Sequence, residues 1–205
     1  MKATIPGVEV IDTPGLCDPD MEIPIWTEKY NKQMSSKPGM RDVSLVVFII
    51  PPQSRVSANE KILAAVADEA FQSIKSKNMV LVVNKAPKNY TAAKALTNYT
   101  KMRESVKNCS LPVLTEDRIL ILPEVDYEPQ EKGDIQPTIA LSKQFKQFLE
   151  SKIPKDSQTI TAKKANVSSI TEKVADKAVK EEMERMIATF KEEKASIMAE
   201  ADKRI

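Results

Sequence analysis

Apolar runs alternate with amphipathic stretches along most of the chain. The runs predict four strands, over residues 4–11, 43–50, 79–83 and 118–122. The second run is continuous and β-branched, which is typical of a strand buried on both faces of a parallel sheet. Apolar positions at three- and four-residue spacing predict helices over residues 57–74, 91–107 and 137–153, and part of residues 21–34 is also expected to be helical. Alternating strands and helices indicate an α/β fold.

The last quarter of the chain has a different pattern. Pro154 ends the third helix, and the polar residues 154–168 are expected to form a linker. A capping box at Ser169–Glu172 precedes a stretch without Pro or Gly, so one long amphipathic, coiled-coil-like helix is expected over residues 169–205. Its charges nearly balance, with Asp176–Lys180 and Glu181–Arg185 at pairing distance along the helix. Such a helix either docks back on the domain or pairs with a partner helix.

Composition narrows the function classes. The net charge of +2 over 205 residues, without a basic cluster, argues against nucleic acid as a partner. The chain has no histidine, and Cys17 and Cys109 lack ligand spacing, which excludes a zinc site and a histidine-based triad. Two unpaired thiols favour a reducing, cytoplasmic location. The longest apolar run is too short to span a bilayer, and nothing indicates membrane contact.

Two motifs follow predicted strands. The first strand ends in Asp12-Thr13-Pro14-Gly15, and ligands bind at the carboxyl ends of strands in open α/β sheets. A carboxylate there can hold a magnesium-bound water, and a glycine lets the backbone approach an anion closely. The ordinary alternative is a buried strand followed by a Pro-Gly turn.

The second motif begins at Asn84-Lys85, directly after the third predicted strand and one helical crossover beyond the first motif. In GTPases an Asn-Lys-x-Asp turn at this place reads guanine. Because both motifs stand at the expected ends of a βαβ frame, together they indicate a nucleotide site more strongly than either alone.

The chain resembles the immunity-associated, avirulence-induced-gene type of GTPases, septin-related members of the P-loop NTPase superfamily. The resemblance rests on residues 10–16, Pro38-Gly39, the strand at 45–50 and Arg55-Val56-Ser57-Ala58-Asn59-Glu60. It implies a three-layer P-loop GTPase-like parallel sheet, with residues 1–153 as a partial G domain that binds GTP or GDP with Mg²⁺.

The resemblance also implies roles for individual residues. Asp12 would contact magnesium through water, the Gly15 amide would sense the terminal phosphate, and Thr13 would be a further cofactor-binding residue. Asn84 would support the nucleotide pocket, and the stem of Lys85 would lie over the base. Where the family motif has an acidic residue this chain has Pro87, which leaves guanine specificity open.

The phosphate loop is missing from this sequence. That loop requires two glycines five positions apart, followed by Lys and Ser or Thr. The four glycines, Gly7, Gly15, Gly39 and Gly133, include no such pair. We therefore expect an N-terminally truncated G domain that lacks a central strand, assign no catalytic residue, and do not expect hydrolysis by this chain. Either the chain is a fragment of a longer protein, or the strands flanking the gap pair directly.

Two functions follow. The first is a GTP-binding protein whose complete form is a nucleotide-dependent interaction or assembly switch, forming a homo-oligomer or binding a protein through residues 169–205. The second is a non-enzymatic interaction or scaffold module derived from a degenerate G domain.

Overall fold

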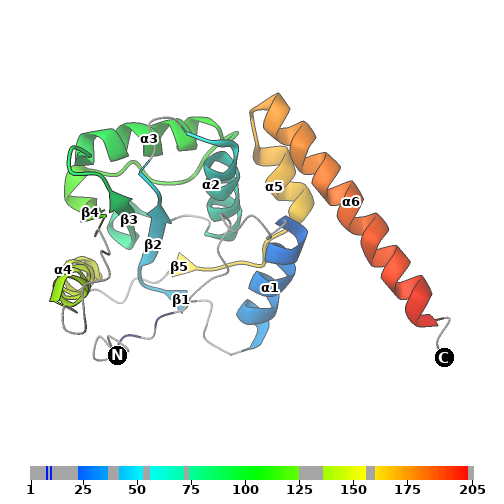
Figure 1. Cartoon of the computed structure of the whole chain (residues 1–205), viewed down its shortest axis with the longest axis horizontal. Helices are drawn as coiled ribbons and strands as arrows, with labels where there is room; N and C mark the ends of the chain where they lie inside the picture. The colour runs from blue at the N-terminus through cyan, green and yellow to red at the C-terminus, as the bar shows by residue number, and fades with distance from the viewer. Residues whose placement is uncertain are drawn as a thin grey trace, which may run out of the picture.

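The computed structural model describes residues 8, 10, 23–36, 42–52, 56–71, 74–124, 136–155 and 160–202. These residues form an α/β structure with a C-terminal helix that leads away from the sheet (Figure 1). The strands are β1 Asp42–Val43, β2 Val46–Ile50, β3 Met79–Ala86, β4 Ile119–Pro123 and β5 Ile160–Thr161. The α-helices are α1 Ile23–Ser36, α2 Ala58–Ala70, α3 Ala92–Glu104, α4 Gln136–Lys152, α5 Val167–Lys173 and α6 Lys177–Asp202.

A three-stranded parallel sheet in the order β2-β3-β4 forms the centre of the molecule. Phe48 of β2 is the partner of Leu81 in β3, and Leu81 is in turn the partner of Ile119 in β4. The first five residues of β3 are buried, as expected for a central strand covered on both faces. The parallel α/β sheet predicted from the sequence is therefore confirmed.

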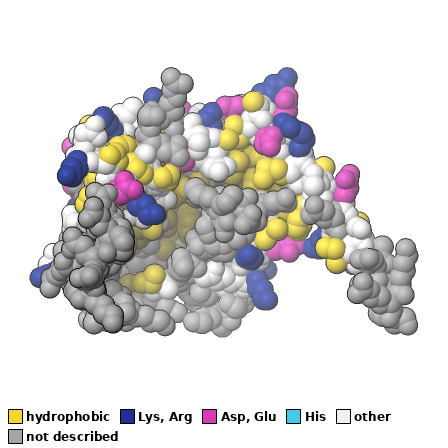
Figure 2. Space-filling model, viewed as in Figure 1, with side chains coloured by type: hydrophobic (Ala, Val, Ile, Leu, Met, Phe, Trp, Pro, Cys, Tyr) yellow, Lys and Arg dark blue, Asp and Glu magenta, His cyan; other side chains and the backbone are white. Residues whose placement is uncertain are grey.

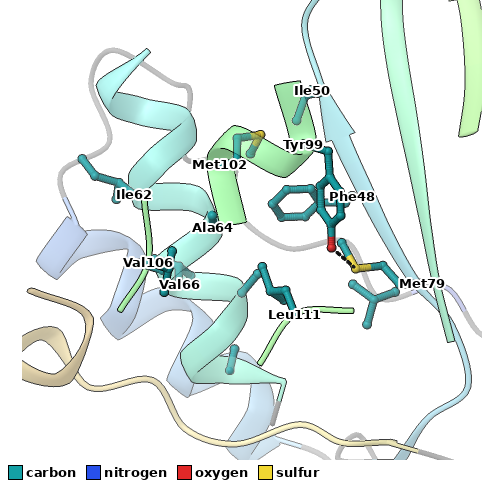
Figure 3. Packing of buried hydrophobic residues seen from close by; sticks show 14 of the residues in the cluster. Phe48, Ile50, Ile62, Ala64, Val66, Met79, Tyr99, Met102, Val106 and Leu111 are labelled. Carbon is teal, nitrogen blue, oxygen red and sulfur yellow. Dashed lines mark hydrogen bonds between the residues drawn. The ribbon is translucent and has the colours of Figure 1, made fainter. Parts of the chain in front are cut away.

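One face of the sheet packs against α2 and α3. Residues that alternate along the strands point into this core, because side chains in a strand face opposite sides in turn: Val46, Phe48, Ile50, Met79, Leu81, Val83 and Ile119. Tyr99 of α3 donates a hydrogen bond from its hydroxyl to the Pro112 carbonyl at 2.8 Å, and the same hydroxyl lies 3.5 Å from the Met79 sulfur (Figure 3).

The other face of the sheet is less completely covered. Val80, Val82 and Leu120 are buried on it, and α4 packs beside β4. Ile49 of β2 is 53% exposed on the same face. Within the described residues β2 pairs with β3 along one edge only. In the described ranges β2 and β4 are therefore the two edge strands of this sheet, and the exposed Ile49 leaves part of this face open at β2.

Ser57 and Glu60 form a capping box at the start of α2. The Ser57 backbone N–H donates to Glu60 Oε2 at 2.8 Å, and the Glu60 N–H donates to Ser57 Oγ at 3.5 Å. Burial raises the pKa of Glu60, although the bonds from Ser57 oppose that shift. The cap thus provides hydrogen-bond acceptors for backbone N–H groups at the first turn of α2, which lies beside the carboxyl ends of the strands.

The predicted strand over residues 43–50 is divided into β1 and β2. The Ser44 carbonyl between them accepts a hydrogen bond from Asn78 Nδ2 at 3.0 Å. β1 pairs antiparallel with β5, which lies in the stretch predicted to be a polar linker. That prediction is wrong for the described part of the stretch, because Ile160, Ala162 and Ala165 are buried in the main core. Single apolar residues among polar ones gave no periodic signal.

The single helix expected over residues 169–205 is instead two helices. Asn166 caps α5 by accepting from the Ser169 N–H at 3.1 Å, so the helix begins before the predicted capping box. The chain then becomes extended at Val174, which forms an antiparallel bridge with Val106. Asp176 Oδ1 accepts from the N–H groups of Ala178 and Val179 and caps α6. A cap in the middle of the stretch ends one helix and starts the next.

The segment from residue 160 to residue 183, called here the C-terminal clamp, docks back on the domain. Ile170, Val174 and Met183 are buried in the main core. Lys173 Nζ contacts Asp68 Oδ2 at 2.6 Å, and Lys61 forms an ion pair with Asp176. Within the helix the pairs are Lys177–Glu181, Lys180–Glu184 and Glu182–Arg185, which replace the expected Asp176–Lys180 and Glu181–Arg185 pairs.

The predicted first strand lies largely outside the described residues. Of residues 4–11, the structure describes Val8 and Val10; neither is in a strand, and Val10 is 71% exposed. None of the helices in the described ranges combines the length and the apolarity that a membrane crossing requires.

Candidate functional site

Asn84 and Lys85 lie at the carboxyl end of β3, the central strand of the sheet. They are exposed, whereas the residues that precede them in the strand are buried. Lys85 has a φ of 59°, in the left-handed region that non-glycine residues seldom adopt. The pairing of β3 with β4 shifts register between Val83 and Ala86, which places this conformation at an irregularity of the strand. The strand thus changes from buried and regular to exposed and irregular at the predicted pair.

The chain beyond this pair is held by the start of α3. The Tyr90 N–H donates to the Pro87 carbonyl at 2.9 Å and closes a turn. Asn98 Nδ2 donates to the Tyr90 hydroxyl at 3.2 Å, and Thr91 caps α3 by accepting from the Lys94 N–H. We call residues 84–89 the β3 turn. Its backbone is fixed from both sides, while the side chains of its members apart from Ala86 remain exposed.

Glu124 lies beside the β3 turn. Pro123 of β4 is the ladder partner of Ala86, and the Glu124 N–H donates to the Ala86 carbonyl at 2.9 Å. The side chain of Glu124 is exposed. The sequence alone assigned no role to this residue. A carboxylate directly after a strand was the available signal.

The phosphate-side residues Asp12, Thr13 and Gly15 lie outside the described residues, so their predicted roles, including magnesium binding by Asp12, stay predictions. Among the residues that the structure describes, no three Cys, Asp or Glu side chains are grouped so that they could hold a metal ion. The carboxyl end of β3 thus presents an exposed amide, an exposed lysine and a neighbouring exposed carboxylate.

Helix α1 connects the region after the first motif with the C-terminal clamp. Asn31 forms reciprocal bonds with Ala165, from Nδ2 to the carbonyl and from the Ala165 N–H to Oδ1, each at 2.8 Å. Glu28 pairs with Lys194 of α6 at 2.6 Å. Trp26 and Tyr30 stack with ring centroids 4.8 Å apart, and burial raises the pKa of Tyr30 to about 12. A displacement of α1 would therefore break or shift the contacts that hold the start of α5 and the side of α6.

A groove of about 510 Å³ lies between α1, α5 and α6. Pro24, Val167, Ile187 and Phe190 give it an apolar part, and charged residues such as Lys191 line it as well. In the space-filling view, hydrophobic and charged side chains lie together where α5 and α6 meet the body (Figure 2). This surface is the second candidate site, for a protein rather than a nucleotide.

Comparison of the chain with protein-family models, with curated proteins and with solved structures finds no match. The two candidate sites are the β3 turn with Glu124, and the groove along α6.

Proposed function

We propose that this chain is a nucleotide-binding protein of the immunity-associated GTPase type, with a P-loop GTPase-like parallel sheet. The observation that carries the proposal is the exposed Asn84-Lys85 pair at the carboxyl end of the central parallel strand. That edge is where open α/β sheets bind ligands. The left-handed backbone at Lys85 is the kind of local strain that concentrates at functional sites.

Each residue has a distinct task in this proposal. The Asn84 amide holds the pocket wall, and the aliphatic stem of Lys85 covers one face of the base while its ammonium stays in water. Asp12, Thr13 and Gly15 form the phosphate side, with Asp12 holding Mg²⁺ through water. The metal ion would neutralise phosphate charge when bound. Hydrolysis is not part of the proposal, because phosphoryl transfer depends on phosphate-loop amides and a lysine that this sequence lacks.

The switch part of the proposal is supported by α1. This helix follows the Asp12–Gly15 motif in the chain, and the Asn31–Ala165 and Glu28–Lys194 contacts join it to the C-terminal clamp and to α6. A nucleotide that shifts α1 would change how α5 and α6 are held. α6 and the groove beside it would then bind a second copy or a protein partner according to nucleotide state.

The test is titration of the purified chain with a fluorescent GDP or GTP analogue, with and without Mg²⁺. We expect saturable binding that the double variant Asn84→Ala, Lys85→Ala weakens about tenfold or more, the equivalent of losing one to two hydrogen bonds. Lys101→Ala, which removes an exposed lysine from α3, is the matched control and should leave binding unchanged. A folded chain that binds neither nucleotide would overturn the proposal.

A non-enzymatic interaction or scaffold module is the second candidate, and the groove between α1, α5 and α6 favours it. In this case association would not depend on nucleotide. Sedimentation of the chain with and without GDP separates the two functions, because a switch predicts a nucleotide-dependent change in assembly and a scaffold predicts none.

A further inference from the structure

We propose that Glu124 reads the edge of a guanine base in place of the acidic residue that Pro87 displaces. This inference rests on the proposed nucleotide-binding function and names the specificity-determining residue of that site. It starts from the hydrogen bond between the Glu124 N–H and the Ala86 carbonyl, which joins the end of β4 to the β3 turn.

Glu124 lies close to Pro87, the position at which the family motif has its acidic residue. Ala86 and Pro123 are ladder partners in neighbouring strands, whose backbones lie about 5 Å apart. Pro87 and Glu124 each follow directly after this pair. A glutamate carboxylate extends about 4 Å from its Cα through three carbon–carbon bonds. The Glu124 carboxylate can therefore reach the position that the carboxylate of an acidic residue at position 87 would occupy.

The β3 turn has no acidic residue of its own. From Asn84 to Asn98 the sequence contains no Asp or Glu, whereas it contains Lys85, Lys88 and Lys94. The Glu124 backbone N–H is used by the Ala86 carbonyl, but its carboxylate has no partner among the residues that the structure describes. An exposed carboxylate beside a turn rich in lysine, and held there by its own backbone, is available to a ligand.

Hydrogen-bond complementarity selects the base. An ionised carboxylate only accepts hydrogen bonds, and its two oxygens match the N1–H and N2–H donors on the edge of guanine. Adenine presents an unprotonated ring nitrogen at the first position and no donor at the second, so it leaves the carboxylate unpaired. A site built to hydrogen-bond a substrate group rejects analogues that lack the group. We therefore expect GDP to be preferred over ADP.

The experiment compares GDP, ADP and xanthosine diphosphate binding to the wild-type chain and to Glu124→Gln by calorimetric titration. Glutamine keeps the length of the side chain but offers a donor, which matches the second carbonyl that xanthine carries instead of the amino group. We expect Glu124→Gln to lose GDP affinity about tenfold or more and to gain affinity for xanthosine diphosphate. Glu116→Gln, an exposed glutamate before β4, is the matched control and should leave both affinities unchanged.

The outcomes separate this inference from the function on which it rests. If the wild-type chain binds GDP and Glu124→Gln binds it equally well, the role of Glu124 is overturned and the nucleotide site stands. If the wild-type chain binds GDP and ADP alike, the base is not read and the inference also fails. If a folded wild-type chain binds no nucleotide, the proposed function and this inference are both overturned.

Discussion

The C-terminal clamp and the β3 turn use polar residues in opposite ways. Where the clamp meets α2, Asp68 of α2 is fully buried and accepts bonds from the Ser110 N–H at 2.5 Å, the Ser110 hydroxyl at 2.6 Å and Lys173 Nζ of the clamp at 2.6 Å. In the β3 turn, Asn84 and Lys85 face solvent. Polar groups that satisfy one another stabilise a fold, whereas polar groups left exposed at the end of a buried strand are available to a ligand.

The first prediction concerns the two halves of α6, and we expect it to have the largest effect. Met183 is fully buried and Ile197 is 67% exposed, although both belong to the same apolar stripe. Met183→Ala should lower the free energy of unfolding by about 3 kcal/mol, because it leaves a cavity in the core. Ile197→Ala should change it by less than about 0.5 kcal/mol. Urea denaturation measures both, and equal effects would contradict the docking of the clamp.

The second prediction concerns Asp68. Asp68→Asn should lower the free energy of unfolding by about 2 kcal/mol, because the new amide would present a donor to the Lys173 ammonium. Glu116→Gln, at an exposed site, serves as the control in the same denaturant titration. An Asp68→Asn variant as stable as the wild-type chain would show that the buried contact contributes nothing.

The pH dependence of the same contact has a defined sign. Burial acts to raise the pKa of Asp68, but the bonds from Lys173 and Ser110 outweigh it and hold the pKa below its ordinary value. The contribution of Asp68 is therefore complete above the ordinary pKa of an aspartate and is lost as the pH falls through the lower folded value. Acid titration of the wild-type chain should show this loss, and Asp68→Asn should lack it.

The contribution of Lys173 to stability depends on pH in the alkaline range. Burial acts to lower the pKa of Lys173, but the hydrogen bond to Asp68 together with the negative charges of Asp68 and Glu69 outweighs burial and raises the pKa above its ordinary value. Its contribution is complete below the ordinary pKa of a lysine and is lost as the pH rises through the higher folded value.

The third prediction concerns the backbone of the β3 turn and has the smallest effect. Lys85→Gly should raise the free energy of unfolding by up to about 1 kcal/mol, because glycine adopts a φ of 59° without strain. Asn108→Gly, at the other positive φ among the described non-glycine residues, should gain less, because asparagine tolerates this region. Lys85→Gly should also weaken nucleotide binding, which Asn108→Gly should not. If Lys85→Gly lowers the free energy of unfolding, the backbone at Lys85 is not strained in the wild-type chain.

Periodic patterns predicted the elements whose buried positions follow from the spacing of apolar residues within the element. The buried strand β3, the helix after the Ser57–Glu60 box and the inward positions Tyr99 and Met102 of α3 follow from spacing alone. The break at Val174 could not be predicted in this way. It depends on a bridge to Val106, about 70 residues earlier, and on hydrogen bonds from Lys107 to Lys173 and from Ala175 to Ser105.

The placement of the candidate site follows from the sequence in part. Asn84 and Lys85 were selected from their position after an apolar run, and both are exposed at the end of β3, while their role in binding stays a prediction. The proximity of Glu124 to the β3 turn could not be predicted, because it arises from pairing between strands that are separated by a helix. Pairing register is set by tertiary structure and leaves no mark within the short loop itself.

The paired bonds between Asn31 and Ala165 join positions 134 residues apart. During synthesis the strands of the sheet leave the ribosome long before Ala165 and Met183. Part of the hydrophobic core of the nascent chain therefore stays exposed to solvent until these residues emerge. Contacts of such long sequence separation also slow folding once the whole chain is free. A nascent-chain length series should therefore show protease resistance appearing late, when the clamp has left the exit tunnel, rather than when the sheet strands have.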